Sequence, residues 1–190
     1  MSEPRADLAQ APSSWVRRWL PLAKPGGEAL DLACGSGRHA RLLAARGLRV
    51  CAVDRDAQAL ALLAGISGVR TLRADLEADP WPFSGLRFDC VIVTNYLHRP
   101  LFPAILDALS VQGVLIYETF ALGNERFGRP SNPAHLLRPG ELLEVVRGRL
   151  RVVAFEDWYV EVPKPAMIQR LVACAGALQP GPGLAAAGET

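Results

Sequence analysis

The chain has 190 residues, of which 50% are hydrophobic and 21% are charged, so it can bury one substantial core and is not of the disordered class. Its 21 basic and 19 acidic residues leave a formal net charge of +2, and no run of like charges predicts a nucleic-acid or membrane surface. No signal segment opens the chain, and no apolar stretch approaches the roughly 18 residues of a membrane span, so a cytoplasmic protein is expected.

Short apolar runs alternate with amphipathic segments, a pattern that predicts a parallel sheet covered by helices. After a polar start at 1–12, expected to be mobile, a first helix begins at Ser13 or Ser14 and ends at Leu20. Its Trp15 and Trp19 are expected to pack into the core, and the alternative is that they cover a bound cofactor. Strands are predicted over 29–32, 48–53, 69–73, 88–93 and 113–117, and helices between them over 39–46, 56–63 and 101–109.

The remaining chain predicts an irregular stretch, a helix and two strands. Residues 121–138 are interrupted by glycines and prolines, and a helix follows over 139–146. The last two strands, over 150–159 and 167–175, are joined by a turn too short for a crossover, which favours an antiparallel hairpin. One domain is therefore expected over 1–178, followed by a disordered tail over 179–190.

A Gly-rich turn between the first strand and its helix carries the clearest functional signal. Gly35 and Gly37 let backbone approach a ligand, and the helix start suits a carboxylate or phosphate. A nicotinamide or flavin site is one interpretation, because Ala40 stands third and Asp54 follows about 20 residues on. However, Asp31 precedes the glycines, and an acid there favours the amino group of a methionine moiety over a pyrophosphate.

The order of these residues resembles class I S-adenosylmethionine-dependent methyltransferases. The matching features are the segment from Asp31 to Gly37, Asp54 closing the second strand and Asp75 after the third, within a likeness over about 29–120. More narrowly, the chain resembles small bacterial methyltransferases of the tellurite-resistance and thiopurine type. The resemblance implies an α/β, Rossmann-like three-layer sandwich: a seven-stranded, mostly parallel sheet with an antiparallel C-terminal strand. It also implies S-adenosyl-L-methionine as cofactor.

For the methionine end of the cofactor, the resemblance assigns Asp31, Ala33, Gly35 and Gly37 as lining residues and places Asn95 near the methyl group. The alternative for the two glycines is that they serve a tight turn alone.

For the adenosine end, the resemblance implies that Asp54 accepts from the ribose hydroxyls and that Arg55 flanks the adenine. Asp75 would accept from the adenine amino group, with the Leu76 backbone beside it. The alternatives are that the two acids only cap the segments that follow them, and that Arg55 is an ordinary solvated residue.

On the acceptor side, His98 and Arg99 follow the fourth strand. A histidine can act as a base near neutral pH, and an arginine can hold an acidic acceptor with two hydrogen bonds. Both are candidate catalytic residues, and the alternative is that they merely begin the next helix and fix its loop. The segment 123–129, with two arginines and Phe127, either grips an anionic or aromatic acceptor or is a surface loop.

The predicted function is methyl transfer to a small-molecule acceptor by in-line displacement. The alternatives are a methyltransferase acting on RNA or protein, a non-catalytic cofactor-binding module and a nicotinamide enzyme. Nucleic acid is not expected as a partner, because the chain lacks a basic patch and reads Asn95-Tyr96-Leu97-His98 where an Asn/Asp-Pro-Pro motif would stand. No metal is expected, because no histidine pairs with another ligand at metal spacing.

Overall fold

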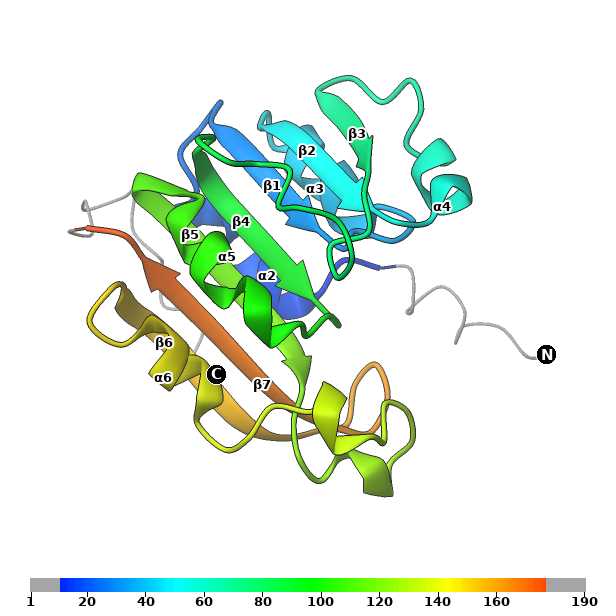
Figure 1. The fold of residues 1–190 in the computed structure, drawn as a ribbon, viewed down its shortest axis with the longest axis vertical. Coiled ribbons are helices and arrows are strands. Elements are labelled where there is room, and N and C mark those ends of the chain that lie inside the picture. Colours follow the sequence, from blue (N-terminus) through cyan, green and yellow to red (C-terminus); the bar gives the residue numbers. More distant parts are fainter. Residues whose placement is uncertain (1–10, 177–190) are drawn as a thin grey trace, which may run out of the picture.

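The computed structural model describes residues 11–176, so all but the last two residues of the segment 1–12, expected to be mobile, and the tail 179–190, expected to be disordered, lie outside the described part. Within it, seven strands form one sheet in the order β3-β2-β1-β4-β5-β7-β6 (Figure 1). The strands are β1 Glu28–Leu32, β2 Arg49–Asp54, β3 Val69–Arg73, β4 Phe88–Thr94, β5 Leu109–Phe120, β6 Arg151–Val160 and β7 Ala166–Cys174.

Strands β1 to β5 pair in parallel, whereas β7 runs antiparallel to both β5 and β6. The predicted fold class is therefore confirmed, including the C-terminal hairpin. The α-helices are α2 Ser14–Trp19, α3 Arg38–Ala45, α4 Ala57–Ala61, α5 Phe102–Asp107 and α6 Glu141–Val146. Short 3-10 turns are η1 Leu20–Leu22, η2 Arg99–Leu101, η3 Asn124–Arg126 and η4 Pro133–His135.

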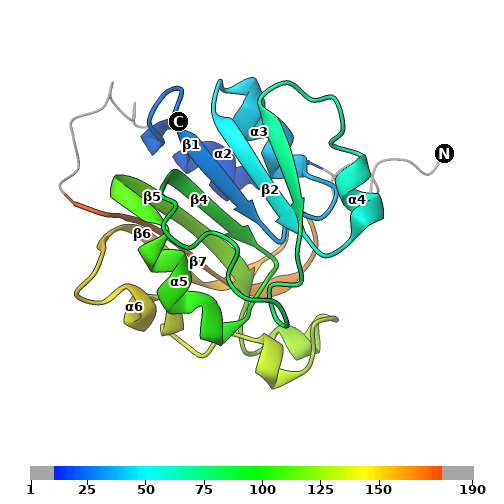
Figure 2. The same cartoon turned by 45° about the horizontal axis from the view of Figure 1, so that its top comes forward.

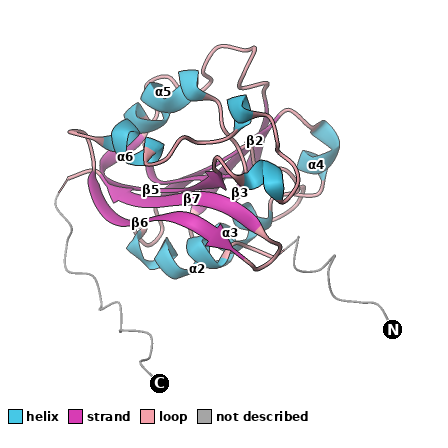
Figure 3. Cartoon of the chain, turned by 90° about the horizontal axis from the view of Figure 1, so that it is seen from below, coloured by secondary structure: helices cyan, strands magenta, loops and turns pink. Residues whose placement is uncertain are grey.

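The sheet is the middle layer of three, with α2 and α3 on one face and α5 and α6 on the other (Figure 3). Successive side chains of a strand point to opposite faces, so each central strand serves two cores. In β1, Leu30 and Leu32 join the core on the α5 and α6 side, and Ala29 joins the core on the α2 and α3 side. All three are fully buried, and full burial of a leucine contributes about 1.5–3 kcal/mol.

Two predicted helix starts are confirmed by their caps. The Ser13 side chain accepts hydrogen bonds from the N–H groups of Trp15 and Val16 at the start of α2. Asp56 does the same for Gln58 and Ala59 at the start of α4. These side chains satisfy backbone donors that have no partner within the helix, which fixes where each helix begins.

The observed helix is shorter than the one predicted over 101–109, because the last predicted residue belongs to a strand. Helix α5 ends at Asp107, and Leu109 already pairs with Phe88 as the first residue of β5. The register between β4 and β5 then shifts before Cys90. Gly113 lies in this irregular part, where a Cβ would come 2.8 Å from the Phe88 carbonyl oxygen. The glycine therefore permits the close approach that makes β5 longer than expected.

The arrowheads of β1, β2 and β4 point to the same edge of the sheet (Figure 2). The turns that leave this edge are those after Leu32, Asp54, Thr94 and Phe120. Ligands of open α/β sheets bind outside the carboxyl ends of the strands, so this edge is where a site is expected. Among residues 11–176, no helix has the length and apolar character needed to cross a membrane.

Candidate active site

The turn between β1 and α3 is built by left-handed backbone. Gly35 and Gly37 have φ values of 54° and 77°. A Cβ at Gly37 would lie 2.3 Å from the Leu63 side chain, whereas a Cβ at Gly35 would meet no atom within 4 Å. The Gly35 N–H donates to Asp54 Oδ2 at 2.7 Å, which ties the turn to the end of β2. Gly37 is thus required by packing, and the face at Gly35 stays open.

Asp31 lies beneath this turn and is 1% exposed. Its Oδ2 atom has no hydrogen-bond partner among the described residues. Burial raises the pKa of the carboxyl to about 7, although the Ala40 N–H and the charge of Arg38 act in the opposite direction. A buried carboxylate oxygen without a partner is costly to desolvate, and a ligand ammonium would satisfy it.

A cavity of about 180 Å³, here called the Asp75 cavity, opens at the ends of β1, β2 and β3. It brings together five of the residues predicted to bind the cofactor, from three separate turns. Its lining residues are Ala33, Asp54, Arg55, Ala74, Asp75, Leu76, Glu77 and Tyr96.

The acids of the Asp75 cavity also cap local backbone. Asp54 Oδ1 accepts from the Asp56 N–H at 2.9 Å, and Asp75 Oδ1 accepts from the Glu77 N–H at 3.0 Å. Arg55 Nη1 lies 4.0 Å from Asp75 Oδ2. Capping and ligand binding are compatible here, because each carboxylate oxygen has two acceptor sites. The caps hold both carboxylates in place beside the cavity.

Tyr96 belongs to this cavity although the sequence did not assign it to the site. Its hydroxyl is buried without a partner among the described residues, and burial raises its pKa. Its carbonyl oxygen accepts a hydrogen bond of 2.9 Å from the Tyr117 hydroxyl, which anchors the turn after β4. The signal was present: an aromatic residue directly follows Asn95 at the end of a predicted strand.

A second cavity of about 300 Å³, here called the Arg17 cavity, lies among α2, the end of β5 and the β6–β7 hairpin. Asn95, the ninth predicted cofactor residue, is in its wall with φ of 55°. The charged residues of the wall are Arg17, Arg38, Lys164, Arg170 and Glu118. Its other lining residues are Ala11, Pro12, Ser13, Ser14, Phe120, Val160, Val162, Pro163, Ala166 and Ile168.

Within the Arg17 cavity, Arg170 forms ion pairs with two acids. Its Nη1 lies 3.4 Å from Glu118 Oε2, and its Nε lies 3.1 Å from Glu156 Oε2. The three residues are cross-strand neighbours on β5, β7 and β6. The guanidinium also lies 5.2 Å from the centre of the Trp15 ring, a cation–π distance. Arg170 therefore joins the sheet to α2 within the wall of the cavity.

His39 links the start of α2 to the end of β4 through two hydrogen bonds, a role that was not predicted from the sequence. Its Nε2 accepts from the Ser13 N–H at 3.1 Å, so the imidazole is neutral and carries its proton on Nδ1. That nitrogen lies 3.2 Å from the Thr94 hydroxyl and donates to it. Burial lowers the pKa of His39 to about 3, and the charge of Arg38 adds to the effect.

His98 and Arg99 line neither of these two cavities. Arg99 donates from Nε and Nη2 to the Glu141 carboxylate at 2.7 and 2.9 Å, and to the carbonyls of Ala134 and Leu136. His98 is the N-cap residue of η2. The contacts of Arg99 favour the alternative that it fixes the loop, and His98 begins η2 without a side-chain cap hydrogen bond among residues 11–176.

Glu141, the partner of Arg99, is 4% exposed and takes part in a closed ion-pair cluster. Burial by itself would raise its pKa, but hydrogen bonds from Arg99 and Arg138 outweigh burial and lower the pKa to about 2.

In the segment 123–129, the Asn124 amide donates to the Pro130 carbonyl at 2.9 Å, and the Phe127 ring centre lies 5.2 Å from that of Tyr159. The predicted grip on an acceptor has no support from these contacts.

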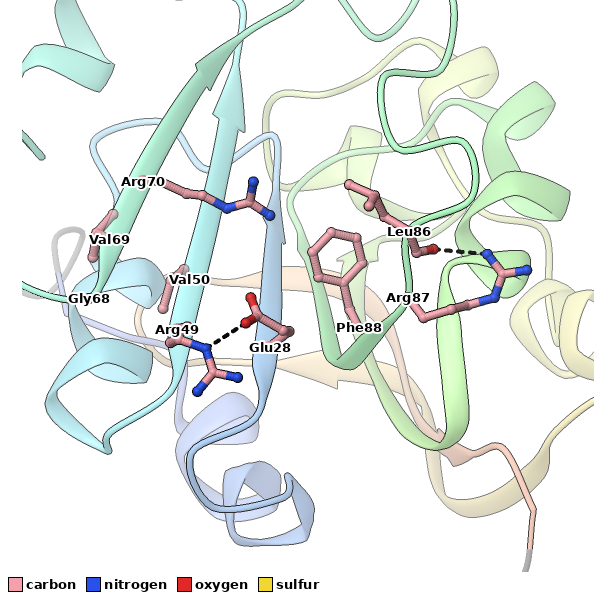
Figure 4. Close-up of a pocket in the computed structure, with 9 residues that line it drawn as sticks. All are labelled: Glu28, Arg49, Val50, Gly68, Val69, Arg70, Leu86, Arg87 and Phe88. Carbon is pink, nitrogen blue, oxygen red and sulfur yellow. Dashed lines mark hydrogen bonds and ion pairs between the residues drawn. The ribbon is translucent and has the colours of Figure 1, made fainter.

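A third cavity, of about 530 Å³, lies at the opposite ends of the strands (Figure 4). Arg70 and Phe88 project toward it from β3 and β4, and Arg49 Nε bonds Glu28 Oε1 at 2.5 Å beside it. It is remote from the carboxyl edge and from the Gly-rich turn. We assign no ligand to it.

Residues 29–111 match a family model described as a methyltransferase domain. No relative among curated proteins matches the chain in sequence. The match covers β1 to the start of β5, and it includes every residue predicted to bind the cofactor.

Solved structures of methyltransferases share the fold. TehB from Haemophilus influenzae has 17% identity and a TM-score of 0.65, over 78% of this chain and 57% of that one. A TehB-like SAM-dependent methyltransferase from Corynebacterium glutamicum ATCC 13032 has 22% identity and a TM-score of 0.63, over 88% and 92%.

A third similar structure is 1,6-didemethyltoxoflavin-N1-methyltransferase from Burkholderia thailandensis, with bound 1,6-didemethyltoxoflavin and S-adenosylhomocysteine. It has 19% identity and a TM-score of 0.63, over 90% and 80% of the two chains. The present chain thus spans little more than half of the Haemophilus influenzae protein and most of the other two.

Proposed function

Because the chain carries a methyltransferase domain with the fold of S-adenosylmethionine-dependent methyltransferases, we propose that it transfers a methyl group from S-adenosylmethionine to a small-molecule acceptor. The cofactor follows from the domain and fold, as the sequence resemblance predicted. The acceptor class and the roles of individual residues are the proposal.

The observation that carries the proposal is the unpartnered Oδ2 atom of Asp31. A carboxylate that is 1% exposed needs a cationic or hydrogen-bonding partner. The amino group of the cofactor's methionine part meets this need at the foot of the Gly-rich turn. A pyrophosphate would instead bring negative charge to a buried acid, which argues against a nicotinamide cofactor.

The Asp75 cavity fits the adenosine end of the cofactor, the start of α3 fits its methionine end, and the Arg17 cavity fits the acceptor. The Asp75 cavity has acceptor oxygens on Asp54 for ribose hydroxyls and on Asp75 for an adenine amino group, with Tyr96 beside them. The start of α3 offers N–H groups to the methionine carboxylate. Asn95 lies in the wall of the Arg17 cavity, where we place the acceptor.

The small-molecule acceptor is supported by the walls of the Arg17 cavity, which α2 and the hairpin close from two sides. Its volume of about 300 Å³ is at the lower end of the range for small-ligand sites. The Burkholderia thailandensis protein of the same fold also has a small molecule bound.

In this proposal, S-adenosylmethionine supplies a methyl group on a sulfonium, whose sulfur keeps the bonding electron pair as the acceptor's lone pair bonds to carbon. The protein's residues orient the acceptor in line and exclude water. Arg170 holds Glu118 in the wall of the Arg17 cavity. The Glu118 carboxylate can there accept a proton from an acceptor that starts protonated.

The test is titration calorimetry with S-adenosylmethionine, S-adenosylhomocysteine and NAD. Micromolar binding of the first two without NAD is the expected result. Binding of NAD alone would refute the assignment of Asp31. Binding followed by no transfer of a radiolabelled methyl group to any small molecule would leave a cofactor-binding module and refute the catalytic proposal.

A further inference from the structure

We propose that the methyl acceptor is an organic anion, whose charged group is bound by Arg17 and Lys164 and whose apolar part lies against the β6–β7 hairpin. This inference rests on the proposed function and narrows its substrate class. It derives from the distribution of charge and apolar surface in the Arg17 cavity.

Two of the positive charges in the wall of the Arg17 cavity have no acidic partner in the described part of the chain. Arg170 already has two glutamates as partners. Arg38 also lies in the wall, but its Nη1 donates to the Ala11 carbonyl at 3.3 Å and its charge acts on Asp31, so we assign it to the cofactor end of the site. Arg17 and Lys164 remain, and neither forms an ion pair among residues 11–176.

These two cations come from different elements and face one cavity. Arg17 lies on α2, and Lys164 lies in the turn between β6 and β7, where its Nζ is 5.5 Å from the centre of the Phe120 ring. Two like charges around one cavity repel a protonated amine and attract an anion. A positively charged sulfonium nearby would strengthen this preference.

The rest of the wall is apolar and therefore fits an acceptor with an apolar organic part. It is formed by side chains at the end of β5 and in the hairpin: Phe120, Val160, Val162, Ala166 and Ile168. A volume of about 300 Å³ has room for about ten water molecules of ~30 Å³ each. A single inorganic oxyanion would leave most of this space and its apolar wall unfilled.

The test compares acids with their neutral amides on protein saturated with S-adenosylhomocysteine, at constant ionic strength. The probes are benzoate and benzamide, 4-hydroxybenzoate and 4-hydroxybenzamide, and 2-aminobenzoate and 2-aminobenzamide. We expect the acids to bind about tenfold more tightly, as for one charge-assisted hydrogen bond. Phenyl phosphate, compared with benzoate, tells whether the site prefers a phosphate or a carboxylate.

The Arg17→Gln/Lys164→Gln double variant should lose the preference for acids and still bind S-adenosylhomocysteine. The matched control is Arg18→Gln/Lys24→Gln, which removes the same charge from exposed positions outside the cavity and should keep the preference. Equal responses to acid and amide, including no response to either, overturn the inference, as does an equal loss in the control. Failure of wild-type protein to bind S-adenosylhomocysteine refutes the proposed function instead, before any acid is added.

Discussion

Replacement of Asp31 by asparagine should raise the unfolding free energy of the cofactor-free protein at pH 8 and abolish binding of S-adenosylmethionine. Asp31 is 1% exposed, and burial raises its pKa from 3.8 to about 7. The folded state therefore binds the proton more tightly than the unfolded state does. The stabilising contribution of this carboxyl is complete below pH 3.8 and is lost as the pH rises to about 7.

The size of the effect follows from the pKa shift. Each pKa unit corresponds to about 1.4 kcal/mol, so ionised Asp31 costs on the order of 4 kcal/mol above pH 7. Asparagine can still accept from the Ala40 N–H, but its own buried N–H groups cost about 1–3 kcal/mol. A net gain of about 1–3 kcal/mol in unfolding free energy is therefore expected at pH 8, and a net loss of up to about 2 kcal/mol at pH 4, where Asp31 is protonated and only the cost of the asparagine N–H groups remains.

The assay is urea unfolding of wild type and Asp31→Asn at pH 4 and pH 8, together with calorimetric titration of the cofactor. Because the ammonium requires an ionised partner, wild-type affinity should fall up to about tenfold per pH unit below pH 7. A variant that binds the cofactor normally would refute the role of Asp31. A variant that is less stable at pH 8 than wild type would refute the charge argument.

Three further substitutions separate binding from folding. Asp54→Ala should weaken S-adenosylmethionine binding by about 1–3 kcal/mol in calorimetry, because a half-buried acceptor and the hydrogen bond to Gly35 are lost; unchanged affinity would remove Asp54 from the site. His39→Leu should abolish one source of acid sensitivity, because His39 has a lowered pKa of about 3 and the folded state resists its protonation, so wild-type stability falls from pH 6.5 toward pH 3. Urea unfolding across that range measures the difference, and parallel pH profiles would contradict it. Arg99→Ala should cost about 3 kcal/mol of unfolding free energy by leaving buried Glu141 without its main partner, with cofactor affinity unchanged; a selective loss of methyl transfer in a stable Arg99→Ala protein would restore Arg99 as a catalytic residue.

Local signals explain what could be predicted. The β1–α3 turn follows from Gly35 and Gly37, and the starts of α2 and α4 follow from Ser13 and Asp56, because each feature is set by backbone within a few residues. The acids predicted at the ends of β2 and β3 do line one cavity, since parallel strands bring their carboxyl ends together.

Long-range contacts explain what could not be predicted. The extension of β5 depends on pairing between Leu109 and Phe88, and the fate of Arg99 depends on Glu141, which lies far along the chain. The Arg17 cavity joins α2 to a hairpin from the other end of the sequence. No periodicity within a single segment indicates that Arg17 and Lys164 face the same space.

The attachment of α2 through His39 has a consequence for how the Arg17 cavity can change in evolution. The match to the methyltransferase family model begins at residue 29, so the helix α2 in the wall of the Arg17 cavity lies outside the matched residues. The side chains proposed to bind the cofactor and most of those around the Arg17 cavity are therefore carried by separate stretches of chain. Exchange of α2 and the hairpin turn between homologues, with Ser13, His39 and Thr94 retained, offers a route to new acceptors on an unchanged cofactor-binding half.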